Sequence, residues 1–433
     1  MITVVGTGTG AAPAESLAGA ELVVGGRRHL DAAAVPAGAE RVVLGPLAPA
    51  LDVIERHLDK GSRVVVLASG DPGFFGIVRV LAERFGAAAL DVRPGVSSVA
   101  AAFARVGVPW DDAVVVSAHG RDLRTAVNVC RARPKVAVLT GPGAGPAELG
   151  AALAAGGAEE GRRAGAAPLG PVAQFPAPLR RELLVASALG TRDERVERVT
   201  PSEAAARDWG TAVSVVLCLD EGRALGAVRT VAGPPPAPSQ WALEESEFTH
   251  RDSMITKFEV RALALARLGP RLGDLIWDVG AGSGSVAVEC ARLGAAVVAV
   301  EKAADGVERI RANADAHGVD VQVVHGGAPD ALGELADDPD AVFVGGGGRE
   351  LPEIVAVCAR RARRSVVVAM AALDRVPAVR AALTDAGFDC DGVLLQSSRL
   401  APLPGDVTRL AATNPVFLLW GVRNPAYREG VAQ

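Results

Sequence analysis

The amino-acid sequence predicts an α/β protein that folds as two domains. Short apolar runs such as ITVVG, RVVVLAS and KVAVLT alternate with Ala- and Leu-rich stretches, which is typical of strands and helices that alternate along a chain. Residues 233–238, GPPPAP, interrupt that alternation, because consecutive prolines lack N–H donors and hold extended geometry. With 433 residues, of which 49% are hydrophobic, the chain has enough apolar material for two separate cores.

The Pro-rich break sets the predicted domain boundaries. We place a first α/β domain at residues 1–230, a linker at 231–244 and a second domain at 245–425. In the second domain the runs LIWDVG, AVVAVE, AVFVGG and SVVVAM are apolar on both strand faces, which indicates a mostly parallel sheet covered by helices. Residues 158–178 are rich in Gly, Ala and Pro without a clear period, and we expect a mobile surface insertion there.

The charge and composition argue against several classes of protein. A net charge of −5 disfavours a nucleic-acid-binding surface, because phosphate binding needs a local excess of Lys and Arg. The five cysteines are widely spaced and the six histidines form no ligand pattern, so we expect a reducing compartment and no protein-bound metal. The N-terminus enters a strand directly and no uncharged apolar run reaches membrane-spanning length, which predicts a cytoplasmic protein without a membrane segment.

The stretch WDVGAGSGSVAVE, residues 277–289, predicts a strand that turns into a helix through a glycine-rich loop. A dinucleotide-binding turn has the spacing G-x-G-x-x-G, whereas Gly280, Gly282 and Gly284 give G-x-G-x-G here. Asp278 precedes the first glycine, at a place where it would repel a pyrophosphate. The turn is therefore wrong for NAD.

S-adenosylmethionine (SAM) makes different demands on such a turn, because it carries a sulfonium cation, an amino acid and a ribose but no phosphate. Glycines let the backbone pass close to it, and Asp278 can hold its ammonium group directly or through water. Glu301 ends the next predicted strand, where a carboxylate can accept both ribose hydroxyls. The pattern predicts a Rossmann-like, SAM-dependent methyltransferase, with another nucleotide-binding protein as the alternative.

A helix is predicted upstream of this turn, in the segment ITKFEVRAL. Thr256 and Glu259 have the spacing of a capping box, so Thr256 either caps this helix or contacts the cofactor. The segment AVFVGGGGREL, at the predicted fourth strand, lacks the Asn/Asp-Pro-Pro-aromatic loop of amino-group methyltransferases. A nucleic-acid N-methyltransferase is therefore disfavoured.

Five segments of the second half together resemble the decarboxylating precorrin methyltransferase domain of cobalamin biosynthesis, over nearly all of residues 245–424. They are ITKFEVRAL, WDVGAGSGSVAVE, VHGGAPDAL, VGGGGREL and TNPVFLLWG. Gly327 stands where members of that family often have an acidic residue, which leaves one adenine contact open. The resemblance implies SAM contacts at Thr256, Gly280, Ala281, Gly282, Ser283, Gly284, Glu301 and Ala328.

The motif VVGTGTG at residues 4–10 has a similar glycine pattern but no acidic residue at the strand end. Together with LASGDPGFFG, RPGVSSVAAAFARVGVPWDD, SAHGRD and LGTRDERV, it resembles the tetrapyrrole (corrin and porphyrin) methyltransferase family. These motifs cover most of residues 1–220. The resemblance implies two α/β subdomains with SAM bound in a folded shape between them.

The same resemblance implies site residues in the first half. Backbone groups of Gly73 and Phe74 would meet SAM, and Ser97 and Ser98 would touch it, with helix capping as the alternative for the serines. Arg121 is a candidate for binding a substrate carboxylate, with a solvated arginine as the alternative. The implied substrate-binding residues are Gly6, Gly8, Gly10, Asp71 and His119, of which His119 fits a surface histidine equally well.

Both halves resemble components that act on one macrocycle, so the whole chain resembles the fused, decarboxylating precorrin methyltransferases. That resemblance implies methylation at macrocycle positions 5 and 15 with two SAM per cycle, loss of carbon dioxide from the position-12 acetate, and precorrin-8X as product. Methyl transfer depends mostly on proximity and alignment, and the conjugated ring can absorb the electrons left by decarboxylation. A proton donor is still required, for which Lys257, Glu259 and Arg261 are candidates unless they form a solvated helix face.

Two other functions stay open at this point. One is a SAM-dependent methyltransferase with another substrate, such as diphthamide or RNA. The other is a non-catalytic SAM-binding sensor, although two cofactor sites would be unusual for one. The expected partners are a tetrapyrrole substrate and further copies of the same chain.

Overall fold

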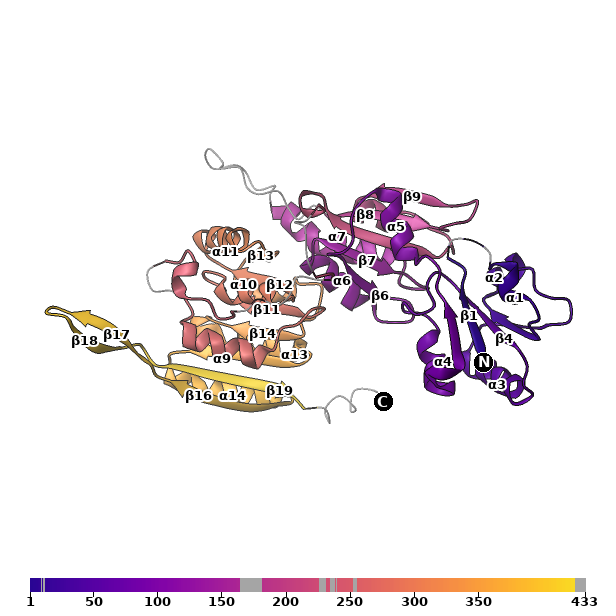
Figure 1. Ribbon diagram of the computed structural model, residues 1–433. Helices are drawn as coiled ribbons and strands as arrows, with labels where there is room; N and C mark the ends of the chain where they lie inside the picture. The colour runs from indigo at the N-terminus through magenta and orange to yellow at the C-terminus, as the bar shows by residue number, and fades with distance from the viewer. Residues whose placement is uncertain are drawn as a thin grey trace. The chain divides into compact units, whose positions relative to one another are not determined.

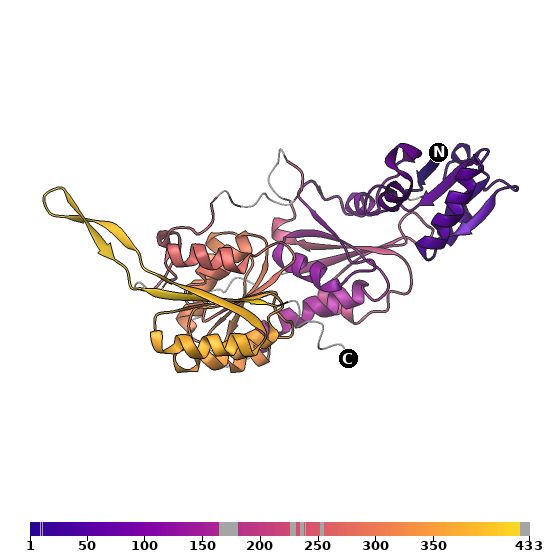
Figure 2. The same ribbon diagram turned by 90° about the horizontal axis from the view of Figure 1, so that it is seen from below.

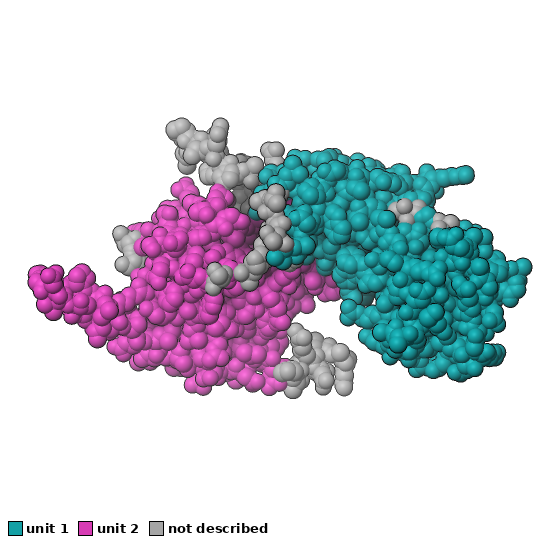
Figure 3. Space-filling view, in the orientation of Figure 1, with its two compact units in different colours: residues 1–121, 135–150, 181–233 teal, residues 122–134, 151–180, 234–433 magenta. Residues whose placement is uncertain are grey.

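The computed structural model describes residues 1–8, 10, 12–163, 181–225, 231–233, 238, 240–251 and 255–424, and it divides into two compact units (Figure 3). Unit 1 consists of residues 1–121, 135–150 and 181–233, and unit 2 of residues 122–134, 151–180 and 234–433. The chain passes from one unit to the other between Gly233 and Pro234, inside the predicted linker. Residues 122–134 and 151–180 fall in unit 2, although the predicted boundaries place them in the first domain.

The first sheet of unit 1 is fully parallel and has the order β3-β2-β4-β1-β5. Its strands are β1 (Ile2–Gly6), β2 (Leu22–Gly25), β3 (Glu40–Val43), β4 (Val64–Ala68) and β5 (Leu90–Arg93). The helices that alternate with them are α1 (Ala14–Leu17), α2 (Arg27–Ala32), α3 (Leu47–Asp59) and α4 (Val78–Phe85). Strands β1, β2 and β4 are almost wholly buried, which agrees with their unbroken apolar sequences.

The second sheet of unit 1 is mixed, with the order β6-β7-β10-β8-β9. Its strands are β6 (Val114–Ser117), β7 (Lys135–Leu139), β8 (Arg181–Ser187), β9 (Arg195–Val199) and β10 (Ser214–Asp220). Strands β6 and β7 are parallel and the other neighbours are antiparallel. The accompanying helices are α5 (Ser98–Val106) and α8 (Pro201–Ala205). Helix α6 (Leu123–Ala132), which connects β6 to β7, belongs to unit 2, and α7 (Pro146–Arg163) begins in unit 1 and continues into unit 2 from residue 151.

The insertion predicted at residues 158–178 begins inside a regular element. Helix α7 continues to Arg163, so the first six residues of that segment are helical. Residues 164–178 lie outside the described residues. The absence of an amphipathic period therefore did not exclude a helix at the start of the segment.

Unit 2 is built on a seven-stranded sheet with the order β13-β12-β11-β14-β15-β19-β16, in which β19 runs antiparallel to its neighbours (Figure 1). Its strands are β11 (Leu275–Val279), β12 (Ala296–Glu301), β13 (Gln322–His325), β14 (Ala341–Val344), β15 (Ser365–Met370), β16 (Phe388–Leu395) and β19 (Val416–Arg423). Its other helices are α9 (Phe258–Leu268), α10 (Ser285–Arg292), α11 (Ala304–Ala316), α12 (Asp330–Gly333), α13 (Leu351–Arg361) and α14 (Val376–Asp385).

Apolar cores cover both faces of this sheet, as the sequence of its strands predicts. Trp277 and neighbouring strand residues pack with α12, α13 and α14, whereas Ile276 packs with α9, α10 and α11. Successive strand residues point to opposite faces of the sheet, and both side chains are fully buried because helices cover both faces. The predicted, mostly parallel sheet with helices on both sides is confirmed.

A two-stranded arm extends from the edge of this sheet (Figure 1, Figure 2). It consists of β17 (Ser398–Leu403) and β18 (Val407–Ala412), which pair antiparallel. Leu400 and Leu410 lie opposite each other on the arm and are 78% and 67% exposed. In the part of the chain that the structure describes, no helix is long and apolar enough to cross a membrane.

Candidate active sites

The glycine-rich turn of unit 2 lies where the strand order of the sheet reverses. From β11 the chain proceeds to β12 and β13 on one side and then returns to β14 on the other side of β11. The loops that follow β11 and β14 therefore diverge, and such a switch point is where open α/β sheets bind ligands. Residues 280–284 follow β11 directly, so the turn occupies this position.

The three glycines of the turn serve different purposes. All three have positive φ, at 72°, 59° and 72° for Gly280, Gly282 and Gly284. A Cβ on Gly280 would lie 3.2 Å from the nitrogen of Gly346, and one on Gly284 would lie 3.0 Å from the side chain of Ile310. A Cβ on Gly282 would meet nothing within 4 Å. The first and third glycines therefore permit close packing, whereas Gly282 borders open space.

Glu301 fixes the turn from the end of the neighbouring strand β12. Its Oε2 accepts a hydrogen bond of 2.8 Å from the N–H of Gly282, and its Oε1 accepts one of 2.8 Å from Ala303. Gly306 leaves room for this carboxylate, since a Cβ there would lie 2.7 Å from Cγ of Glu301. Each carboxylate oxygen keeps a further lone pair for a ribose hydroxyl, so the observed geometry fits the predicted role.

Asp278 is a buried carboxylate with one unsatisfied oxygen. It is 1% exposed, and its Oδ2 accepts a 2.9 Å hydrogen bond from the N–H of Ala287 in α10. Its Oδ1 has no hydrogen-bond partner within the described residues. Burial raises the pKa of this carboxyl to about 7; the Ala287 N–H opposes the rise and the charge of Glu301 adds to it. An orphaned carboxylate oxygen beside a glycine turn fits a cationic ligand such as SAM.

The remaining predicted cofactor residues of unit 2 have structural contacts of their own. Ala281 donates its N–H to the Val300 carbonyl at 3.2 Å, and the carbonyl of buried Ser283 accepts a 2.8 Å hydrogen bond from the Asn313 side chain. Ala328 is half-buried and packs against the core that contains Trp277. A direct contact between these residues and SAM stays a prediction.

The capping box predicted at Thr256 and Glu259 is wrong. Helix α9 begins one residue later than expected, with Lys257 as its N-cap and no side-chain capping bond. The carbonyl of Thr256 instead accepts a hydrogen bond from Arg261. The carboxylate of Glu259 accepts hydrogen bonds from Arg399 and forms no capping box with Thr256.

Arg261 does not suit the predicted role of a proton donor to substrate. Its side chain is 0% exposed, lies 3.5 Å from the carboxylate of buried Glu289, and stacks 4.9 Å from the ring of Phe248. Burial lowers its pKa, and the charge of Glu289 opposes that effect. We therefore correct the prediction: Arg261 holds the segment before α9 against the core rather than facing a substrate.

Glu259 is held in its ionised form by an arginine that sequence reasoning missed. Arg399 in β17 lies 2.9 Å from Glu259 and 2.7 Å from Glu245. The hydrogen bond from Arg399 lowers the pKa of Glu259 and lowers that of Glu245 to about 2. Because an ionised carboxylate does not donate a proton, this pairing favours Lys257 over Glu259, and the proton-donor role of both stays a prediction.

In unit 1 the fold brings the predicted motifs together. Strands β4, β1 and β5 are neighbours and parallel, so the loops that follow them meet at one edge of the sheet. A Cβ on Gly6 would lie 2.4 Å from the carbonyl oxygen of Gly70 and 2.5 Å from the nitrogen of Gly95. Gly8 forms a bridge with Gly70, while Gly10 is exposed with nothing within 4 Å of a Cβ. Gly6 is thus required by loop packing, whether or not a tetrapyrrole lies nearby.

The loop after β4 presents two aromatic rings beside Arg121. Oδ1 of Asp71 accepts a 2.8 Å hydrogen bond from the N–H of Gly73, which shapes the loop. Phe74 and Phe75 are 37% and 52% exposed and meet edge to face, with ring centroids 5.0 Å apart. The guanidinium of Arg121 lies 5.8 Å from the ring of Phe75, so the structure joins the GDPGFF and SAHGRD motifs.

The predicted site residues Ser97 and His119 of unit 1 make contacts within the protein itself. Ser97 is the N-cap of α5, and its Oγ accepts a 3.1 Å hydrogen bond from the N–H of Ala100, which confirms the capping alternative. Ser98 is the first residue of that helix. His119 is exposed, with Nδ1 3.4 Å from the carbonyl oxygen of Thr140. Contacts of these residues with SAM or substrate stay predictions.

Comparison with known proteins now identifies the family. The sequence model described as "Tetrapyrrole (Corrin/Porphyrin) Methylases" matches residues 1–205, and that described as "Precorrin methyltransferase domain" matches residues 247–422. A protein of Sinorhizobium named precorrin-6Y C(5,15)-methyltransferase [decarboxylating] is 37% identical over 338 residues, which is 77% of this chain and 74% of the relative. The chain belongs to this family.

Two shorter relatives each match only part of this chain, and each has a name that refers to a single methylation. A probable cobalt-precorrin-6B C(15)-methyltransferase (decarboxylating) of Pyrobaculum calidifontis is 37% identical over 38% of this chain and 87% of its own length. A cobalt-precorrin-7 C(5)-methyltransferase of Salmonella typhimurium is 38% identical over 36% of this chain and 79% of its own length. The family is thus one of SAM-dependent methyltransferases, and decarboxylation belongs to it.

Proposed function

We propose that this chain converts precorrin-6Y to precorrin-8X, by methylating macrocycle positions 5 and 15 and removing carbon dioxide from the position-12 acetate, with two SAM per cycle. The observation that carries the proposal is a pair of glycine-rich loops in one chain. Each loop follows a buried strand that lies between two parallel neighbours in the sheet of its own unit. One of these loops lies beside the carboxylates of Asp278 and Glu301, and the other packs against the loops after β4 and β5. In a member of a decarboxylating C(5,15)-methyltransferase family, this pair of loops supports two methyl transfers by one protein.

In unit 2 we assign SAM to the turn at residues 280–284. The backbone of the turn would pass beneath the ligand at Gly282, Glu301 would bind the ribose, and ionised Asp278 would stabilise the positive charge. When bound, SAM supplies an electrophilic methyl group. Unit 2 would methylate position 15 and bind the acetate that is lost, and Lys257 would return a proton to the product.

In unit 1 we assign binding of the macrocycle to the exposed aromatic pair and Arg121. Phe74 and Phe75 offer apolar surface to a flat conjugated ring, and the guanidinium of Arg121 can bind one of its carboxylates in bidentate fashion. Gly73 and the N-terminal end of α5, at Ser97 and Ser98, would hold SAM through backbone groups. Unit 1 would methylate position 5.

We also propose that copies of the chain associate. The arm β17–β18 carries Leu400 and Leu410 in exposed positions, and burial of such side chains against another copy would be favourable. A cytoplasmic location, and the lack of a nucleic-acid partner, remain predictions from the composition.

Product mass tests the proposal directly. The purified chain is incubated with precorrin-6Y and excess SAM, and the macrocycle is analysed by mass spectrometry. Gain of two methyl groups together with loss of carbon dioxide is the expected result. An unchanged macrocycle mass, with SAM bound, would favour a SAM sensor or a methyltransferase for another substrate.

A further inference from the structure

Helix α6 lies in unit 2 although both strands that flank it in the chain belong to unit 1. The helix is capped by Asp122, whose side chain accepts a 2.9 Å hydrogen bond from the N–H of Arg124. Five consecutive side chains from Ala126 to Cys130 are buried, so both faces of the helix are covered.

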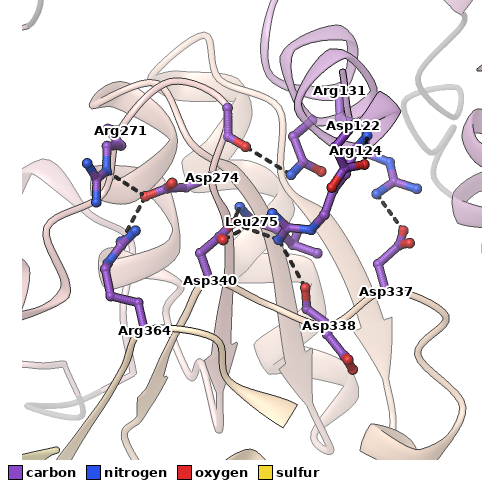
Figure 4. Close-up of polar contacts among 12 residues, drawn as sticks. Asp122, Arg124, Arg131, Arg271, Asp274, Leu275, Asp337, Asp338, Asp340 and Arg364 are labelled. Carbon is purple, nitrogen blue, oxygen red and sulfur yellow. Dashed lines mark hydrogen bonds and ion pairs between the residues drawn. The ribbon is translucent and has the colours of Figure 1, made fainter. Parts of the chain in front are cut away.

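The polar contacts of α6 come from residues that repeat at helical spacing. Arg124, Asn128 and Arg131 occupy positions i, i+4 and i+7 and therefore share one face. Nη1 and Nη2 of Arg124 lie 3.0 and 2.7 Å from the two carboxylate oxygens of Asp340, and Nη2 also donates to the carbonyl of Asp338 at 3.0 Å (Figure 4). This is a bidentate fork, the arrangement in which an arginine binds a carboxylate with the greatest geometric specificity.

Two further contacts extend this face along the helix. Asn128 is 1% exposed and donates a 3.0 Å hydrogen bond to the carbonyl of Gly273. Nη1 of Arg131 lies 2.8 Å from the carboxylate of Asp337, and its Nη2 donates to the carbonyl of Ala152 at 2.9 Å. These bonds would leave buried polar groups unsatisfied if the helix moved away.

The surface that receives α6 is formed by loops that precede β11 and β14. We call Gly273, Asp337, Asp338 and Asp340 the acidic edge. Oδ2 of Asp340 also accepts a 2.8 Å hydrogen bond from the N–H of Leu275, and this bond joins the two loops without any contribution from α6 (Figure 4). Because β11 and β14 are parallel, the acidic edge lies at the opposite end of the sheet from the turn at residues 280–284. Binding of α6 there leaves the candidate SAM site free.

We propose that the acidic edge is a docking surface for helix α6, and that this docking holds residues 1–233 to residues 234–433 independently of the Pro-rich connection. The partner is defined by its chemistry: a helix with two arginines and a buried asparagine on one face, received by the carboxylates of Asp337 and Asp340 and by the backbone carbonyls of Asp338 and Gly273. The proposal does not depend on the identity of the substrate.

Cleavage of the full chain between the halves tests the docking. A site-specific protease sequence replaces residues 234–237, the folded protein is cut, and the fragments are separated by size-exclusion chromatography. We expect the cut protein to elute as one species, and the variant Arg124→Ala/Asn128→Ala/Arg131→Ala to elute as two, with the fragment dissociation constant raised by about 100-fold or more. The matched control, Arg198→Ala/Arg207→Ala, removes two exposed arginines of unit 1 and should elute as one species.

A charge exchange separates loss of docking from loss of folding. Asp337 is 44% exposed at its side chain and binds Arg131, so Arg131→Asp and Asp337→Arg should each weaken the association by about 10-fold, and the combined variant should recover most of it. Elution of the cut parent protein as two separate fragments would overturn the proposal. Continued association of the triple variant would overturn it equally, as would a combined variant no better than the two single ones.

Discussion

The two glycine turns, at residues 6–10 and 280–284, have nearly the same sequence pattern but different surroundings. Both follow a buried strand that lies between two parallel neighbours, β1 in one case and β11 in the other. In unit 2 a carboxylate precedes the turn and a second carboxylate binds its middle glycine. In unit 1 the first glycine is enclosed by backbone atoms of two other loops.

This difference shows what a glycine pattern does and does not specify. At Gly6 the missing side chain lets three loops pack against one another, whereas at Gly282 it leaves space that a ligand can use. The acidic residues distinguish the two cases, because only the second turn has Asp278 and Glu301 beside it. Carboxylates near the turn, rather than the glycines, therefore indicate where a cation is bound.

The largest expected effect is on folding of unit 1. Gly6→Ala would place a Cβ 2.4 Å from a carbonyl oxygen, so the loops must separate, and we expect the free energy of unfolding to fall by more than about 3 kcal/mol. Gly10→Ala is the matched control, with no atom within 4 Å of its Cβ and an expected change within about 0.5 kcal/mol. Denaturant unfolding measures both. Equal stabilities would refute the packing role of Gly6.

The second prediction concerns activity of unit 2. Asp278→Ala removes the buried carboxylate, and we expect decarboxylation and methylation at position 15 to fall by about 100-fold or more, while a single methyl group is still added. Mass spectrometry of the product distinguishes the two outcomes. The control is Asp305→Ala, which removes an exposed acid from α11. Loss of both methylations in a folded protein would contradict independent sites.

The third prediction is a pH dependence of SAM binding. Asp278 binds a cation only when ionised, and its pKa is about 7, so the dissociation constant of SAM at unit 2 should rise about 10-fold per pH unit as pH falls below 7. Calorimetric titration between pH 5.5 and 8.5, values chosen to span that pKa by about 1.5 units, measures it. In Asp278→Asn this dependence should disappear; a slope retained in the variant would assign it to another group.

The same group gives stability a pH dependence of opposite sense. The unfolded carboxyl has an ordinary pKa near 4, so between about pH 4 and 7 the folded chain keeps a proton that the unfolded chain has lost. The contribution of Asp278 to the free energy of unfolding therefore falls as pH rises through this window and is constant above it. The expected slope is about 1.4 kcal/mol per pH unit at most, and it should be absent in Asp278→Asn.

The smallest expected effect is on substrate binding in unit 1. Arg121→Ala removes a guanidinium that lies beside Phe75, and we expect KM for the macrocycle at position-5 methylation to rise by about 5- to 10-fold with kcat little changed. Arg41→Ala, in exposed strand β3, is the control. A fall in kcat at constant KM would give Arg121 a role in the reaction rather than in binding.

The fold was predictable from the sequence because local patterns determine most of it. Trp277 and Ile276 show why: a strand that is apolar at successive positions can only be buried on both faces. The meeting of the loops after β1, β4 and β5 also follows, since adjacent parallel strands end at one edge of a sheet. The candidate SAM turn was identified from Asp278, the glycines and Glu301, all of which the structure brings together.

The contacts that sequence reasoning missed are long-range pairs of charges. Arg124 and Asp340 are 216 residues apart, and nothing in the period of either segment points to the other. Arg399 binds Glu259 across 140 residues, and that pairing overrode a capping-box spacing that was locally correct. Local spacing predicts which elements form, but it does not predict which distant side chain competes for a carboxylate.

The hydrogen bond from Gly282 to Glu301 makes one amide a spectroscopic reporter for a single site in a protein proposed to have two. A ribose hydroxyl that approaches this carboxylate would weaken its hold on the amide proton and move the Gly282 resonance. Selective glycine labelling would therefore let the filling of unit 2 be followed during turnover, without separating the halves of the chain.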